Sequence, residues 1–186
     1  ILRGLLNWHQ DDLPGLTTRA ARHGVDLRGP VVLAAVEVDG NRASYVLRQL
    51  RTTSGFEATL LDEIDGLLIV LSGGSTPGPV RELLERRLRD FGRQVTGVVS
   101  ESVSRVAELP RVYESLRRCL GLLRRLERTG TIASEAELRA YALAFERLGR
   151  EEIGAFFEAT IGKLLEADRK RGSALATISR SCSLGA

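Results

Sequence analysis

Apolar residues form two kinds of pattern along this chain, and each pattern predicts a type of element. Residues 30–39 are apolar on both faces until Glu37, which predicts a central strand of a covered sheet. Elsewhere the apolar residues recur every three or four positions, which predicts amphipathic helices. The clearest of these helices are expected over residues 42–51, 79–91 and 110–128.

A β-hairpin is expected between two short apolar runs, residues 56–61 and 67–71. The residues between them, 62–66, end in an Asp-Gly pair, which is a strong signal for a tight turn between antiparallel strands. Residues 94–99 give one more strand. Shorter or later helices are expected over residues 1–13, 16–24, 102–108, 134–148 and 150–166, with a break at residues 12–15.

The resulting order is strand, helix, hairpin, helix, strand and helix. It predicts an α+β fold in which an antiparallel, ferredoxin-like palm sheet is covered by helices. We expect an N-terminal helical lead-in over residues 1–29, the palm over residues 30–130, and an all-helical segment over residues 131–186.

Composition narrows the class of protein. The 186 residues have a formal net charge of only +3, which is weak evidence for a nucleic-acid-binding face. Two cysteines far apart, Cys119 and Cys182, fit a reducing cytoplasm, and no apolar run is long enough for a membrane span. The chain contains no Met, so we interpret it as a piece of a longer protein.

Residues 161–178 are the most distinctive stretch. An apolar helix end runs into Glu-Ala-Asp-Arg-Lys-Arg, Gly172 interrupts the helix, and Ser173 can cap the next one. This stretch resembles the segment that precedes the helix-turn-helix DNA-binding domain in PucR/CdaR-type bacterial transcription regulators. Residues 16–29 and the palm order resemble the same family, whose middle domain is GGDEF-like. Residues 179–186 depart from the family pattern.

The resemblance implies a function. The chain would be the sensory and dimerisation module of such a regulator, a homodimer that positions a helix-turn-helix absent from this chain. DNA would be a partner only through that absent domain, and a small metabolite could act as effector. The resemblance names no cofactor.

Four acidic residues are the candidate ligand or ion site. Glu37 and Asp39 lie at the end of the first strand, where a diguanylate cyclase of this fold keeps a metal-binding acid, and Asp62 and Asp65 lie at the hairpin. Solvated turn acids are the alternative interpretation. The Gly-Gly-Asp/Glu-Glu-Phe signature is absent, so we expect no enzyme activity; a degenerate, nucleotide-binding cyclase-like domain remains the alternative function.

One helix face is rich in arginine and offers a third hypothesis. It could bind nucleic-acid phosphates, but the preferred interpretation is a solvated face opposite the leucine stripe, or one that pairs with acids such as Glu114 and Glu127. The residues are Arg117, Arg118, Arg124, Arg125 and Arg128.

Overall fold

The computed structural model describes residues 1–7, 12–39, 42–89 and 95–139. The chain divides into two compact units, Ile1–Ala140 and Tyr141–Ala186, and all described residues belong to the first. The resemblance at residues 161–178 and most of the two last predicted helices therefore lie outside the described residues.

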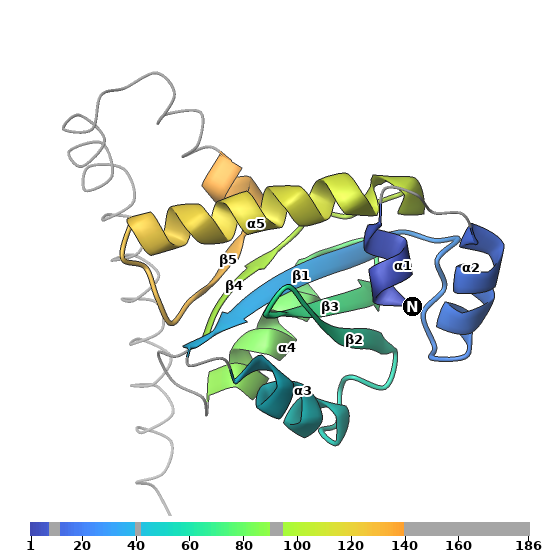
Figure 1. Ribbon diagram of the computed structural model, residues 1–186, viewed down its shortest axis with the longest axis horizontal. Helices are drawn as coiled ribbons and strands as arrows, with labels where there is room; N and C mark the ends of the chain where they lie inside the picture. Colours follow the sequence, from blue (N-terminus) through green and yellow to red (C-terminus); the bar gives the residue numbers. More distant parts are fainter. Residues whose placement is uncertain (8–11, 40–41, 90–94, 140–186) are drawn as a thin grey trace, which may run out of the picture. The chain divides into compact units, whose positions relative to one another are not determined.

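A five-stranded sheet forms the centre of the first unit (Figure 1). Its spatial order is β2-β3-β1-β4-β5, and all neighbouring pairs are antiparallel except the parallel pair β4–β5. The strands are β1 (Val31–Val38), β2 (Thr59–Ile64), β3 (Leu67–Gly73), β4 (Val95–Val99) and β5 (Ile132–Ser134). The predicted mixed α+β class is confirmed.

Helices cover both faces of this sheet. In Figure 1, α5 crosses one face and α3 and α4 lie on the other. Helix α1 contacts α5 and β2 and so covers the α5 side. The helices are α1 (Leu2–Leu6), α2 (Leu13–Ala21), α3 (Ala43–Arg51), α4 (Gly78–Leu88) and α5 (Leu109–Arg125), and a 3-10 helix spans Val106–Glu108.

Strand β1 supplies the core on both faces, as its continuous apolar run predicts. Val32, Ala34 and Val36 are fully buried in one cluster with residues of α3 and α4. Leu33 and Ala35 are also fully buried, and strand alternation directs them to the opposite face, under α5. Burial on both faces explains why the polar residues of this strand occur only near its end.

Two predicted boundaries are wrong for identifiable reasons. Residues 12–15, expected as a break, begin helix α2: the Asp12 carboxylate accepts a hydrogen bond from the Gly15 N–H at 3.1 Å. Pro14 suits the first turn because its missing N–H would have had no partner there. The helix expected over residues 102–108 is only the 3-10 turn Val106–Glu108, because Val103 exchanges backbone hydrogen bonds with Val31.

Strand β5 corrects a third expectation, that the chain is all-helical from residue 131. Ile132–Ser134 pairs in parallel with β4 at Gly97, Val98 and Val99. A Cβ at position 97 would lie 2.7 Å from Ile132 Cδ1, so glycine gives that side chain its space. A run of three residues is too short for a periodic signal, and only its partner strand makes it a strand.

A helix begins directly after β5. Residues 135–139 are helical, and Ser134 caps them: its Oγ accepts from the Ala136 N–H at 3.2 Å, while Glu137 Oε2 accepts from the Ser134 N–H at 3.3 Å. This reciprocal pair is a capping box. Among the described residues, no helix is both long and apolar enough to cross a membrane.

The hairpin turn gives the first testable prediction. Asp65 and Gly66 both have positive φ, 53° and 77°, as a two-residue turn between twisted strands requires. A side chain at position 66 would meet nothing within 4 Å, so the only cost of Gly66→Ala is backbone strain. We expect this substitution to lower the free energy of unfolding by about 1 kcal/mol in urea titration.

Gly73→Ala is the matched control. Gly73 ends β3 without positive φ and also has open space around its Cβ position. Its unfolding free energy should stay within about 0.5 kcal/mol of the parent. Equal effects at both positions would contradict the turn assignment.

Candidate functional site

Three of the candidate acids, Glu37, Asp39 and Asp65, lie at one end of the sheet, whereas Asp62 lies within β2. Glu37 is near the end of β1, and its neighbour across the ladder, Leu67, is the first residue of β3 after the hairpin turn. Asp65 occupies that turn. Strand β1 ends at Val38, so Asp39 lies beyond the strand, and it is exposed.

Helix α5 supplies a cation to Glu37. Arg124 Nε lies 3.0 Å from Glu37 Oε2, and the Glu37 side chain is 28% exposed. The apolar stripe of α5 faces the sheet, so a long side chain beside that stripe reaches the strand end. Glu37 is therefore the acceptor of a charged partner within the domain.

Asp65 is held by the first turns of the same helix. The Tyr113 hydroxyl donates to Asp65 Oδ2 at 3.0 Å, and Arg117 Nη1 lies 4.0 Å from the same oxygen. The Arg117 guanidinium also lies over the Tyr113 ring, 5.7 Å from its centroid. Burial of the phenol, together with its hydrogen bond to the Asp65 carboxylate, raises the pKa of Tyr113 to about 12.

Asp62 and Glu63 point to opposite faces of β2, because they are adjacent in a strand. Asp62 pairs across the ladder with Ile69, and its Oδ1 accepts from the Glu63 N–H at 2.9 Å. The Glu63 carboxylate accepts a hydrogen bond from the Ser44 hydroxyl of α3, on the other face of the sheet. Strand β3 separates Asp62 from Glu37.

The positions of the acids determine whether they could bind a metal ion together. No group of three or more His, Cys, Asp or Glu side chains within the described ranges is arranged to hold a metal ion. Each of Glu37, Asp62 and Asp65 accepts from a donor inside the domain. The ladder pairs Asp62 with Ile69 and Ile69 with Ala35, so Asp62 and Glu37 face the same side of the sheet with β3 between them.

Sequence reasoning missed the partners on α5. The expected pairing with Glu114 is present, since Arg117 Nη1 lies 3.3 Å from Glu114 Oε1, but Arg117 and Arg124 also reach acids of the sheet, which the sequence does not predict. Tyr113, Arg117 and Arg124 are separated by four and seven positions, which places them along one side of the helix next to the leucine stripe. This spacing indicates that the three side chains lie on one side of the helix, but the sequence does not say which residues of the sheet they contact.

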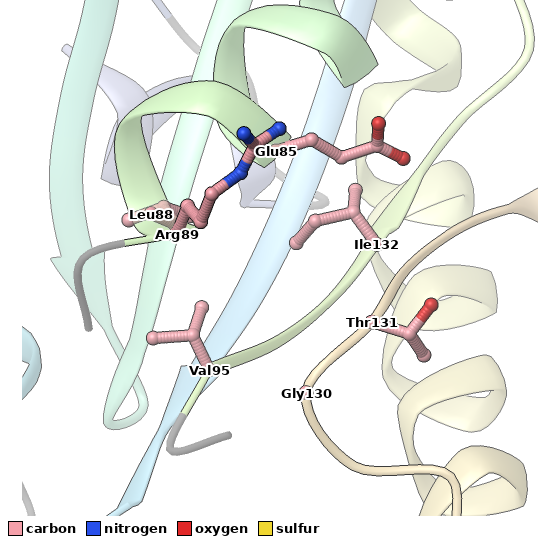
Figure 2. A pocket seen from close by; sticks show the side chains of 7 residues that line it. All are labelled: Glu85, Leu88, Arg89, Val95, Gly130, Thr131 and Ile132. Carbon is pink, nitrogen blue, oxygen red and sulfur yellow. The ribbon is translucent and has the colours of Figure 1, made fainter. Parts of the chain in front are cut away.

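Two cavities of the described unit differ in position. The larger, about 550 Å³, adjoins β2 and includes Asp62 in its lining, and three of its polar residues already bond within the domain. Arg51 donates to the Leu61 carbonyl, and Asp62 and Glu57 accept from the backbone N–H groups of Glu63 and Gly55. The smaller, about 270 Å³, lies between α4 and the strands β4 and β5 (Figure 2).

Beside the smaller cavity, Arg81 joins α4 to the helix that follows β5. It bonds Glu85 at 2.8 Å and Glu137 at 3.0 Å. Burial lowers the pKa of the Arg81 guanidinium, but the two carboxylates together outweigh burial and raise that pKa. Arg81 therefore stays charged and keeps both bridges.

Comparison with known proteins identifies the domain. The family model described as the GGDEF-like domain matches residues 7–122, which is more than half of the chain. The chain belongs to the GGDEF-like domain family. Among solved structures it is similar to the active GGEEF domain of a diguanylate cyclase from Vibrio cholerae, with 16% sequence identity, a TM-score of 0.45, and coverage of 63% of this chain and 88% of that one. A comparison with curated proteins finds no match.

The GGDEF-like domain of this chain lacks the Gly-Gly pair at its hairpin. The turn is Asp65-Gly66, and Ile64 ends the strand before it. The described site thus combines a sheet and a hairpin with acids that accept from donors on α5, β2 and α3.

The raised pKa of Tyr113 predicts how stability falls in alkali. Below about pH 10 the phenol is neutral in both the folded and the unfolded chain, so it adds no pH dependence. Between pH 10 and 12 the unfolded chain releases a proton that the folded chain retains, so the free energy of unfolding decreases with pH in this window. Urea titrations of the parent chain at about pH 9 and about pH 11 should show this decrease.

Tyr113→Phe removes the titrating group and should make the decrease shallower. At neutral pH the variant loses the hydrogen bond to Asp65, which costs about 1 kcal/mol. If the free energy of unfolding of Tyr113→Phe fell between about pH 9 and about pH 11 as steeply as that of the parent chain, the raised pKa of Tyr113 would be refuted. Tyr45→Phe serves as a control because Tyr45 is 49% exposed.

Proposed function

We propose that this GGDEF-like domain works without catalysis, as the sensory and dimerisation module of a PucR/CdaR-type transcription regulator. The observation that supports the proposal is that the candidate acids are already bonded to donors within the domain. Glu37 is bonded to Arg124 and Asp65 to Tyr113, while Glu63 faces the opposite side of the sheet. A cyclase needs carboxylates on the first strand and the hairpin to hold cations against a triphosphate.

The regulator part of the proposal rests on sequence. Residues 161–178 resemble the segment that precedes a helix-turn-helix in these regulators. The described unit passes into that region through the capped helix at residues 135–139, which is attached both to α4 and to α5. A domain anchored in this way could set the spacing of two DNA-binding domains in a dimer.

Nucleotide binding without turnover is the second candidate function. Membership of the GGDEF-like family favours it, because the sheet and hairpin of that family are present. It requires that GTP bind in spite of the Asp65-Gly66 turn.

An assay with GTP separates catalysis from the proposed role. We expect the 186-residue chain, incubated with GTP and either Mg²⁺ or Mn²⁺, to release no pyrophosphate. An active diguanylate cyclase domain in the same buffer provides the positive control. Pyrophosphate release that is lost in Glu37→Gln would overturn the noncatalytic proposal, whereas GTP binding alone by calorimetry would favour the second candidate.

Light scattering tests dimerisation. The expected mass is twice the 20.3 kDa of one chain, and it should be independent of GTP. A mass of 20.3 kDa across a hundredfold dilution series up to millimolar protein would contradict the dimerisation role.

A further inference from the structure

The cavity in Figure 2 has an apolar floor and a polar rim. Its floor consists of Leu88, Val95 and Ile132, which belong to the hydrophobic core and are at most 5% exposed. Its rim includes Glu85, Arg89 and Thr131. Small-molecule sites combine apolar side chains with a few polar groups and span roughly 300–1,000 Å³. This cavity has a lining more polar than apolar and is slightly smaller, at about 270 Å³.

The charges at the rim are not equivalent. Glu85 is already paired, since its Oε1 lies 2.8 Å from Arg81 Nε. Within the described ranges, the side chains of Arg89 and Thr131 have no hydrogen-bond or ion-pair partner. Among the described residues of the rim, Arg89 is thus the cation with no described partner, and a ligand that pairs with it would be an anion.

We propose that this cavity is an effector site for a small carboxylate with a short apolar chain. One guanidinium matches one carboxylate through two parallel hydrogen bonds, and the Thr131 hydroxyl can donate a further one. The apolar chain would lie against Leu88, Val95 and Ile132. A doubly charged phosphate fits less well because Glu85 stands on the same rim and would repel it.

The position of the cavity links it to the exit of the chain from the unit. Its two walls are α4 and β5, and the Arg81–Glu137 bridge of 3.0 Å joins α4 to the helix that follows β5. Ile132, in one wall, is two residues before Ser134, which caps that helix. A ligand between the walls therefore changes the spacing that the bridge spans, and it biases the first turn of the helix leading to residues 140–186.

The inference rests on the proposed function for its purpose, but its test is independent. Calorimetric titration of the 186-residue chain would use isovalerate, hexanoate and benzoate, with isovaleramide as the uncharged analogue and inorganic phosphate as a second anion. We expect at least one carboxylate to bind and isovaleramide not to bind. Amide hydrogen exchange would be followed in peptides covering residues 132–139, with and without the bound carboxylate.

Two arginine variants locate the site. Arg89→Gln should weaken carboxylate binding tenfold or more, because a charge-assisted hydrogen bond is lost. Arg86→Gln should bind like the parent, since Arg86 is exposed on the same helix but does not line the cavity. Both residues are exposed, so equal thermal midpoints would verify that both variants fold.

The proposal is supported if binding is lost only in Arg89→Gln and the bound acid changes exchange at residues 132–139. It is overturned if no carboxylate binds, if Arg89→Gln binds as well as the parent, if isovaleramide or phosphate binds as tightly as the acids, or if exchange at residues 132–139 does not respond. None of these readouts depends on GTP or on molecular mass, so the noncatalytic dimer and the effector site stand or fall separately.

Discussion

Helix α5 has to bury one apolar stripe against the sheet, and this requirement fixes the directions of the polar side chains beside the stripe. Leu116, Leu120 and Leu123 are at most 1% exposed, and such residues each contribute roughly 1.5–3 kcal/mol of burial. Once they are in place, the helix cannot rotate without exposing them. Tyr113 then meets the hairpin turn, and Arg124 meets the end of β1.

The same helix also holds the segment after β5. The Ser115 hydroxyl donates to Glu135 Oε1 at 2.7 Å, and Arg139 bonds that oxygen at 3.0 Å. The Glu135 side chain is only 5% exposed. A carboxylate buried to this extent requires its partners, since removal of one would leave a buried charge poorly compensated. The entry to residues 140–186 is thus tied to the core by a polar contact that tolerates little change.

The sequence was informative where one element determines its own pattern. The continuous apolar run of β1, the leucine stripe of α5 and the Asp-Gly turn are local signals, and all three elements were predictable. Strand β5 was not, because three residues become a strand only where Gly97 leaves room for Ile132 on the neighbouring strand. The partners of Glu37 and Asp65 were unpredictable for a similar reason: the pairing depends on how α5 lies across the sheet, which no segment of sequence contains by itself.

Two features of the structure oppose a metal site at these acids, and their magnitudes differ. The Glu37–Arg124 pair is partly exposed, and such pairs contribute at most about 1 kcal/mol, which a divalent cation could readily offset. The ion pair with Arg124 is therefore only a weak barrier to cation binding at Glu37. The stronger one is geometric: β3 lies between Asp62 and Glu37, Asp39 lies beyond the end of β1, and Asp65 is bonded to Tyr113. To bring these carboxylates together, the strand order or the packing of α5 would have to change, at the cost of several buried side chains.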